Sequence, residues 1–490
     1  MFDLAREQTV GPDQLMELAR LSQDSGYDSL GLYLEHRFAY PSVPWAHGLY
    51  ALTPESVLRV RSEFPSLKLV PFLNVLGHME GFLRCEPGES LRESSFGGMM
   101  GCPSRLDFSK LTKSLVDDII QCFDSEIIHL GGDEAWELSN CPVCAQTDKP
   151  EIYSRHMTPL IEQVLSASRQ PAVWGDMFIE HPEILAEIPK QTLVFDWQYR
   201  TGLSNSALSL AAHGHALVGC PTLHVYDAMW VHLKESETNV RQVAFDVKSM
   251  NLEGTCLTTW ECGLFGAYDT LFPAIEWASN VMDNPSWGTR LVDAYSDHRE
   301  FAELMGIELN SLGGQFSFDG HRSRLKCRLL AYGNPFLAWK HHGEELAGEA
   351  GDKALELSQR AIDCSTGEEF KGVAIFVRTS VEIVRMMEAA KRWYAEGEPD
   401  KAVRALSPIR HAFDTLETVA RRTRARIGGS LADIERCGLA KRHVETVIHR
   451  IRQYGRGELG YVPSFDTLVQ TVFVPYDQGC WHRVNKWGCD

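Results

Sequence analysis

Eight short runs of apolar and β-branched residues recur in the first 260 residues, and each is followed by a turn and a helical pattern. Several are apolar throughout, which is typical of parallel strands that helices cover. The runs are MFDLA (1–5), SLGLYL (29–34), LKLVPFLNV (67–75), EIIHLGG (126–132), PAVWGD (171–176), TLVFDW (192–197), HALVGC (215–220) and GTCLTTW (254–260). Eight strand–helix units over roughly 250 residues predict a (β/α)8 barrel, the TIM barrel.

The segments between these runs carry helix signals. The stretch 11–26 has apolar residues at helical spacing and ends on Gly26, and the stretch 53–64 places Thr53 as the N-cap with Pro54 at the first helical position. A doubly wound open sheet would also alternate strands with helices. It often carries a Gly-x-Gly-x-x-Gly turn after its first strand, and that turn is absent here. The count of eight and the missing turn favour the barrel.

After about residue 285, long helical periodicities replace the strands. One pattern has apolar residues at intervals of four, four, three and three, namely Val373, Val377, Val381, Val384 and Met387. We therefore expect two domains, the barrel over residues 1–285 and a mainly α-helical C-terminal domain over residues 286–490.

Composition and charge narrow the partners and the compartment. The chain has 490 residues, 44% of them hydrophobic, so it can bury substantial cores. Its formal net charge of −18 argues against nucleic acid or an anionic membrane as the main partner. We find no signal peptide and no apolar run that could span a bilayer, and the 13 cysteines show no framework spacing. These features predict a cytoplasmic location.

The fourth run leads through two glycines into two adjacent carboxylates, Asp133 and Glu134. Residues at the C-terminal ends of barrel strands project into the active site, so this pair should lie at that rim. Diguanylate cyclases also carry Gly-Gly-Asp-Glu, but on a hairpin and followed by phenylalanine. Ala135 and a polar, loop-like segment follow here, which disfavours the cyclase. Acidic residues are also common at helix N-termini, so the pair alone could be a helix cap.

Motifs at successive strand ends together resemble glycoside hydrolase family 20, the β-N-acetylhexosaminidases. Within that family they look most similar to the branch of cytosolic hexosaminidase D type enzymes. The matching segments are, in chain order, LYLEHRFAYP (32–41), PFLNVLGHME (71–80), HLGGDE (129–134), VWGDMF (173–178), FDWQY (195–199) and LTTWE (257–261). The resemblance covers roughly residues 1–285 and implies that the barrel is a catalytic domain.

The chemistry of that family suits two neighbouring carboxylates. Successive side chains of a strand diverge, so Asp133 and Glu134 cannot both flank one anomeric carbon. Family 20 instead uses the 2-acetamido oxygen of the sugar as the nucleophile, an exception to the rule of two flanking carboxylates. The resemblance implies that Glu134 is the general acid and base, and that Asp133 orients the acetamide. The expected activity is that of an exo-acting, retaining β-N-acetylhexosaminidase acting on carbohydrates with terminal β-linked GlcNAc, GalNAc or both.

Further side chains match the family's sugar-binding positions. Trp174, Trp197 and Trp260 would form apolar walls for the sugar, although any one of them could be a core residue. Tyr199 would contact the acetamide carbonyl. The remaining candidates for substrate contacts are Asp176, Glu35, His78, His129, Arg6 and Glu261.

Three points stay open at this stage. His129 could contact Asp133 or pack in the barrel wall. His36 stands where the family often has an aspartate, and Glu261 directly follows Trp260, so the choice between gluco and galacto sugars is undecided. A barrel that binds amino sugars without cleaving them is the alternative function, and the intact acid pair speaks against it.

Two further motifs have no place in this chemistry. CPVC (141–144) could be half of a zinc site, but no second pair with suitable spacing is nearby, so we expect free or redox-active thiols and neither a metal nor a cofactor. The aromatic and basic cluster GCWHRVNKW (479–487) could dock onto the barrel or onto a second chain, which leaves a homodimer open. Neither nucleic acid nor membrane is an expected partner.

Overall fold

The structure is a computed structural model that describes residues 1–5, 11–48, 51–94, 98–226, 228–260, 264–312, 325, 329–330, 333–425 and 432–465. The chain forms two compact units that interleave along the sequence. The first unit contains Met1–Leu223, Glu235–Trp260 and Ala274–Thr289. The second contains His224–Lys234, Glu261–Pro273 and the residues from Arg290 onward.

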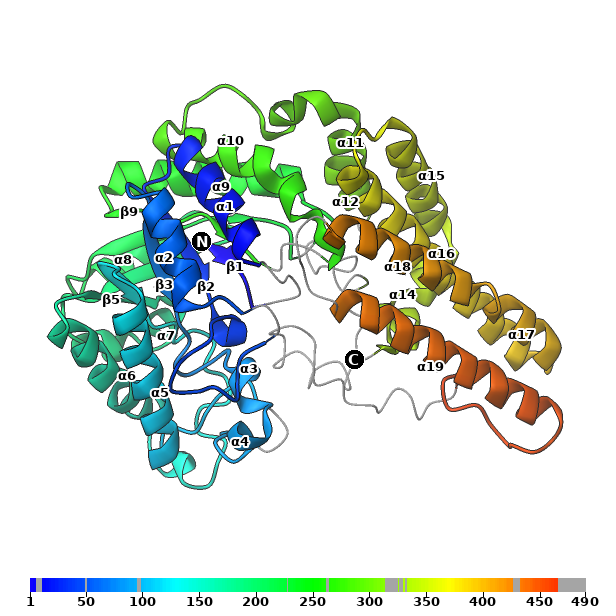
Figure 1. The fold of residues 1–490 in the computed structure, drawn as a ribbon, viewed down its shortest axis with the longest axis horizontal. Helices are drawn as coiled ribbons and strands as arrows, with labels where there is room; N and C mark the ends of the chain where they lie inside the picture. The colour runs from blue at the N-terminus through cyan, green and yellow to red at the C-terminus, as the bar shows by residue number, and fades with distance from the viewer. Residues whose placement is uncertain are drawn as a thin grey trace. The chain divides into compact units, whose positions relative to one another are not determined.

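The first unit is built on a sheet of ten strand segments whose pairings are all parallel in the described residues (Figure 1). The segments are β1 (Phe2–Asp3), β2 (Ser29–Tyr33), β3 (Lys68–Phe72), β4 (Ile127–His129), β5 (Gln170–Trp174), β6 (Leu193–Trp197), β7 (Leu217–Cys220), β8 (Thr222–Leu223), β9 (Gly254–Thr255) and β10 (Thr258–Thr259). All eight predicted strands are present, and the last two are each divided in two.

The divided strands close the barrel. β7 and β8 lie on either side of Pro221, which has no N–H to give to a strand ladder. β7 pairs with β9, and β8 pairs with β10. β10 in turn pairs with β1, where Phe2 is opposite Thr259. Eight strands therefore follow one another in chain order and return to the first, so the predicted (β/α)8 barrel is confirmed.

Helices alternate with the strands and lie outside them (Figure 1). They are α1 (Pro12–Asp24), α2 (Pro54–Glu63), α5 (Leu106–Cys122), α6 (Lys149–Ser166), α7 (Asp176–Glu180), α8 (Ser204–Ala211), α9 (Leu233–Met250) and α10 (Phe272–Asp283). The connection from β3 to α5 adds the short helices α3 (Glu80–Leu83) and α4 (Glu86–Glu89). Thr53 caps α2 as predicted, because its hydroxyl accepts the backbone N–H of Ser56.

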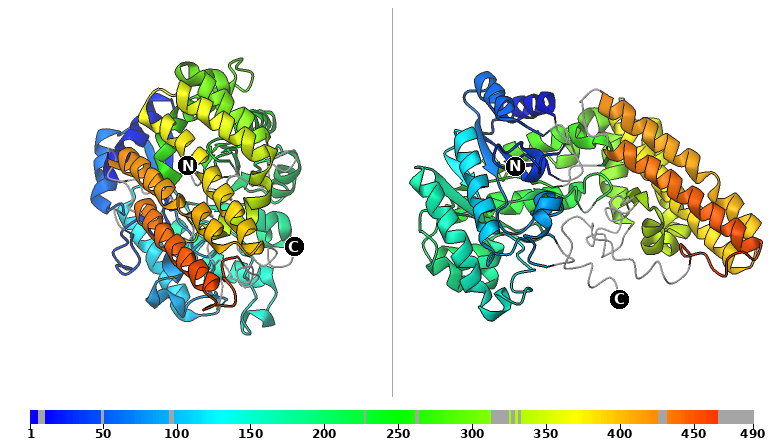
Figure 2. Two further views of the ribbon diagram at one scale, coloured as in Figure 1. Left: turned by 90° about the vertical axis from the view of Figure 1, so that its right-hand side faces the viewer. Right: turned by 60° about the horizontal axis from the view of Figure 1, so that its bottom comes forward.

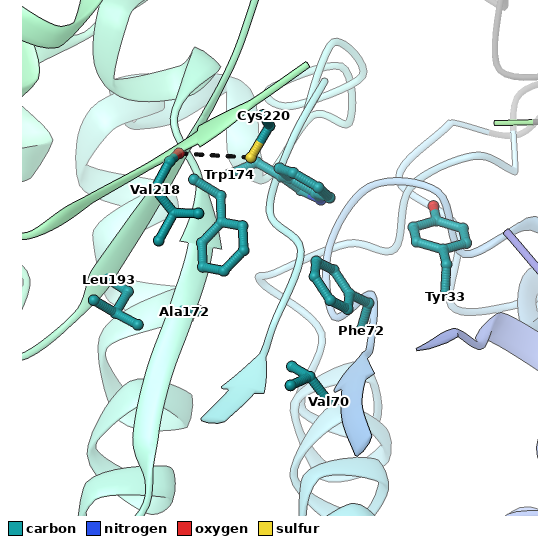
Figure 3. Close-up of a cluster of buried hydrophobic side chains, with 9 residues drawn as sticks. Tyr33, Val70, Phe72, Ala172, Trp174, Leu193, Val218 and Cys220 are labelled. Carbon is teal, nitrogen blue, oxygen red and sulfur yellow. Dashed lines mark hydrogen bonds between the residues drawn. The ribbon is translucent and has the colours of Figure 1, made fainter. Parts of the chain in front are cut away.

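Large aromatic side chains fill the barrel interior beneath the C-terminal strand ends. Phe72, Trp174 and Phe195 belong to one buried cluster, which Figure 3 shows. The ring of His129 lies among them, 4.4 Å from the ring centroids of both Phe72 and Trp174. Dense packing of this kind leaves side chains little freedom to shift, so the strand ends that carry the site have a rigid base.

The second unit is mainly helical in its described residues. Its helical segments are η4 (Leu264–Leu271), η5 (Leu291–His298), α11 (Arg299–Glu303), η6 (Leu304–Glu308), α12 (Leu309–Ser311), α14 (Phe336–Ala347), α15 (Glu349–Cys364), α16 (Glu368–Ala395), α17 (Pro399–Leu406), α18 (Ile409–Ala425) and α19 (Ala432–Gly455). α16 packs against α14, α15, α17 and α18, and it buries the valine stripe noted in the sequence. α18 and α19 run side by side (Figure 2). In the part of the chain that the structure describes, we find no helix of the length and apolarity that a membrane crossing requires.

Candidate active site

The acid pair follows β4 through two glycines that bend the chain. Gly131 and Gly132 have φ angles of +72° and +84°, a region that L-residues rarely adopt. A Cβ on Gly132 would lie 2.5 Å from the hydroxyl oxygen of Tyr153, and that hydroxyl donates a hydrogen bond to the Gly132 carbonyl at 3.0 Å. The chain thus leaves the strand sharply and presents Asp133 and Glu134 at the barrel rim.

His78 lies against both acids. Its Nε2 is 2.9 Å from Oε2 of Glu134 and 3.5 Å from Oδ2 of Asp133. The imidazole is buried, with 4% of its side chain exposed, whereas Glu134 keeps 24%. A Cβ on Gly77 would be 2.5 Å from the carbonyl oxygen of Asp133, so glycine at position 77 is what lets this connection approach the pair. In one tautomer Nε2 can accept the proton of a protonated Glu134, and in the other it can donate to the carboxylate.

Asp176, the first residue of α7, supports Glu134 from the other side. Its Oδ2 accepts the backbone N–H of Glu134 at 2.8 Å, and its Oδ1 accepts the indole N–H of Trp197 at 3.4 Å. Loss of solvation, followed by the charge of Asp133, raises the pKa of Asp176 to about 8. Burial therefore favours the protonated form of this carboxyl, which also positions the backbone of Glu134.

Three candidate site residues share an uncommon backbone conformation. The φ angles are +36° for Glu35, +49° for His78 and +46° for Glu134, in the connections that follow β2, β3 and β4. Among the described residues, the other non-glycine positions with positive φ are Ser139, Ser168 and Asn251. Non-glycine residues in this region are strained by roughly 1 kcal/mol or more, and such strain tends to concentrate at functional sites.

Aromatic side chains at the ends of β5, β6 and β10 contact one another, and Trp197 also donates to Asp176. The indole N–H of Trp260 donates to the hydroxyl of Tyr199 at 2.6 Å, and the rings of Trp197 and Tyr199 lie 5.2 Å apart. Trp197 and Trp260 are partly exposed, whereas Trp174 is fully buried with its ring 5.9 Å from that of Trp260. Partly exposed indoles of this kind offer flat apolar faces to a ring such as a sugar.

Other predicted residues lie further from this arrangement or outside the described chain. His129 is fully buried, its Nδ1 accepts the N–H of Gly131 at 3.1 Å, and burial holds its pKa well below the usual range. It packs in the barrel, one of the two placements the sequence left open. Glu35 is 4% exposed, with Oε2 3.9 Å from Nδ1 of His36. Arg6 and Glu261 lie outside the described residues, as does the cluster 479–487.

Two positioning residues were missed from the sequence. Asn74 donates its amide N–H to the His78 carbonyl at 3.0 Å and to the Tyr33 hydroxyl, and so fixes the turn that carries His78. It stands in the segment 71–80 already singled out, so its place at a strand end was an available signal. Tyr153 lies within the ordinary helical pattern of α6, and nothing in the sequence connects it to Gly132.

Two groups of side chains in the described part of the chain have donor atoms close enough to share a metal ion. His78, Asp133 and Glu134 form the first, and Glu93, Cys102, Cys141 and Cys144 form the second. In each group one ligand atom per residue lies within 4.8 Å of the others. The residues of the first group could also transfer protons, because a histidine and two carboxyl groups are in contact at a partly open rim of the barrel.

Comparison with known proteins gives one family. Residues 88–257 match the model of the glycosyl hydrolase family 20 catalytic domain. No curated protein sequence matches the chain.

Several solved structures are similar to the chain. A beta-N-acetylhexosaminidase from Bacteroides fragilis shares 15% identity with a TM-score of 0.46, over 57% of this chain and 64% of that one. A family 20 exo beta-N-acetylglucosaminidase from Vibrio harveyi, in complex with N-acetylglucosamine, shares 16% identity with a TM-score of 0.48, over 62% of this chain and 56% of that one. A mutant Streptomyces plicatus beta-hexosaminidase in complex with GlcNAc shares 16% identity with a TM-score of 0.46, over 63% of this chain and 67% of that one. The chain thus spans less than two thirds of the length of the first two proteins.

Proposed function

We propose that the chain, whose residues 88–257 match the model of the glycosyl hydrolase family 20 catalytic domain, is an exo-acting, retaining β-N-acetylhexosaminidase of that family. The observation that carries the proposal is the contact of one buried histidine, His78, with two adjacent carboxyl groups at the end of β4. This arrangement supplies a proton donor and a counter-charge at one point of the rim. The proposed substrates are carbohydrates with terminal β-linked GlcNAc, GalNAc or both.

In the proposed reaction Glu134 protonates the glycosidic oxygen as the aglycone leaves. His78 Nε2, 2.9 Å from Glu134 Oε2, stabilises the acid in either protonation state. The acetamido oxygen of the substrate attacks the anomeric carbon, and Asp133 holds the acetamide N–H and balances the positive charge that develops. Glu134 then takes a proton from the water that opens the cyclic intermediate. Two displacements give net retention of configuration.

Retention follows from the proposed nucleophile, the acetamide of the substrate. The attack of the acetamide oxygen and the later attack of water each invert the anomeric centre, so the two steps together retain its configuration. Proton NMR of the first-formed anomer would test this step directly.

The sugar in this proposal occupies the space beside Trp197, Tyr199 and Trp260. The partly exposed indoles would cover the apolar faces of the ring and the acetamide methyl. The Tyr199 hydroxyl, already bonded to the Trp260 indole at 2.6 Å, would face the acetamide carbonyl. Trp174 would act from below by supporting Trp260, since it is fully buried.

The test is hydrolysis of 4-nitrophenyl glycosides by the full chain. We expect cleavage of the β-GlcNAc substrate, the β-GalNAc substrate or both, and none of the β-glucoside, which lacks the acetamido group. Binding of these sugars without any cleavage would favour the alternative, a sugar-binding barrel. Efficient cleavage of the plain β-glucoside would overturn substrate assistance.

A leaving-group series tests the acid. Glu134→Gln should lose most turnover on alkyl glycosides and least on aryl glycosides with acidic phenols, because the latter need little protonation. Glu162→Gln, at an exposed position of α6, is the matched control and should keep full activity. Equal losses across the series would remove the acid role from Glu134.

A further inference from the structure

Beyond the proposed function, a second cluster joins the two connections that carry the acid pair and His78. Glu93 and Cys102 lie between β3 and α5, and Cys141 and Cys144 lie between β4 and α6. The sulfur of Cys102 is 3.6 Å from the sulfurs of both Cys141 and Cys144. Thiolates that share a tetrahedral zinc ion, each with a Zn–S bond of about 2.3 Å, are about 3.8 Å apart. The observed separations match that geometry.

Other uses of three cysteines fit less well. A disulfide needs sulfurs about 2.05 Å apart, and any pairing here would leave a third thiol over. All three cysteines are free.

Glu93 supplies independent evidence that a cation belongs here. Its side chain is buried, with 4% exposed. Oε1 accepts the backbone N–H of Cys141 at 2.9 Å, whereas Oε2 accepts no N–H group in the described part of the chain, and the Cys102 thiol is the other donor close to the carboxylate. A thiol is a weak hydrogen-bond donor, so a metal ion bound by the three sulfurs would satisfy this buried oxygen better.

The surrounding hydrogen bonds also resemble those around a metal centre. The backbone N–H of Cys144 points at the Cys141 sulfur at 3.3 Å, and the Ser104 hydroxyl lies 3.1 Å from the Cys144 sulfur. Such contacts orient ligands and temper the charge on thiolate sulfur.

We propose that Glu93, Cys102, Cys141 and Cys144 bind a structural Zn²⁺ ion. Three thiolates select a soft or borderline metal, and four protein ligands leave no open position for a substrate or an activated water. The sequence argued against zinc because no second cysteine pair stands near 141–144. The fold supplies the missing ligands from positions 93 and 102.

The ion would fix the connections on which the active site depends. The N–H of Cys102 donates to the Leu91 carbonyl at 2.8 Å, and the N–H of Met79, next to His78, donates to the Met99 carbonyl at 2.9 Å. The N–H of Met100 donates to Glu137, three residues beyond Glu134, at 3.2 Å. A metal ion bound by Cys102 would therefore restrain both the turn that carries His78 and the connection that carries Asp133 and Glu134, because short hydrogen-bonded paths join them.

The test begins with metal analysis of the full chain, purified under reducing conditions without chelator. We expect a single zinc ion per chain by mass spectrometry of the metals. A Cys141→Ser/Cys144→Ser double variant should lose it, while Cys122→Ser, which alters a free cysteine outside the cluster, should keep it. Ser104→Ala should weaken zinc binding roughly 10-fold. Replacement by Co²⁺ should give sulfur-to-cobalt charge-transfer absorption and the strong visible bands of a tetrahedral site.

Several results would overturn the proposal. One is wild-type protein that carries no zinc and takes none up when zinc is added to the reduced chain. Another is a folded double variant that retains as much zinc as the wild type, and a third is a disulfide between any two of the three cysteines in freshly purified protein. Glu134→Gln should bind zinc as the wild type does. The test of the metal site is therefore independent of the test of the proposed catalysis.

Discussion

From the backbone conformation of Glu134 we predict how substitutions there change the free energy of unfolding, and this can be checked without any substrate. At a φ of +46° the Cβ of an L-residue crowds the backbone, which costs roughly 1–2 kcal/mol. Glycine avoids that strain but loses about 0.5–1 kcal/mol more conformational entropy on folding. Glu134→Ala and Glu134→Gly both remove the carboxyl group and its contact with His78. They differ by the Cβ alone, so we expect the glycine variant to be the more stable by up to about 1 kcal/mol.

Thermal unfolding followed by tryptophan fluorescence measures this difference. For a domain of this size, 1 kcal/mol moves the Tm by about 2–4 °C. Glu162, at an exposed position inside α6, is the control, because there glycine should be the less stable residue by about 1 kcal/mol. If the control behaves so and Glu134→Ala is nevertheless as stable as Glu134→Gly, Glu134 is not strained. The inference that the fold holds the acid in a costly conformation would then be wrong.

Three further predictions follow from the same site. Asp133→Asn should lower kcat about 100-fold on the N-acetylated aryl substrate, measured in steady state, while substrate binding changes far less, because the counter-charge acts mainly in the transition state. Burial raises the pKa of Glu137 from 4.5 to about 7, so its contribution to stability is complete below 4.5 and is lost as the pH rises to 7. That loss amounts to at most about 3 kcal/mol, so the Tm of Glu137→Gln should fall less than that of the wild type across this window. Trp197→Phe keeps an aromatic face but removes the N–H that Asp176 accepts. We expect a higher KM for the N-acetylated aryl substrate without a change in Tm, because Trp197 contacts the sugar in the proposed function. A fall in Tm with no change in KM would instead make Trp197 a packing residue.

The barrel could be predicted from the sequence because each of its strands has a recognisable local sequence pattern. An apolar run that ends at a turn is a property of neighbouring residues, and eight such runs in order leave few alternatives. The boundaries were less certain. The run 126–132 contains only Ile127–His129 as strand, because Gly131 and Gly132 take positive φ angles that end the ladder. The second half of strand seven was missed, since Pro221 interrupts it immediately after the predicted run.

The contacts that build the site depend on a different kind of information. Asp176 reaches the backbone of Glu134, and Cys102 reaches Cys144, across long separations in the chain. These contacts depend on the paths of the connections after β3, β4 and β5, which have no periodicity for a sequence pattern to reveal. A motif could therefore predict that His78 and the acids share a rim. It could not predict which nitrogen faces which oxygen, nor that Glu93 would complete a set of cysteines.

The site also explains why the proposed nucleophile comes from the substrate. A protein nucleophile would have to be an ionised carboxylate that can approach the anomeric carbon. Asp176 meets neither condition, because its pKa is raised to about 8 and both of its oxygens accept N–H groups, from Glu134 and from Trp197. Asp133 and Glu134 both contact the imidazole of His78, so their carboxyl groups face the same side chain. Under the proposed function, these two groups would hold the acetamide and protonate the leaving group. The attack on the anomeric carbon would then come from the acetamide oxygen.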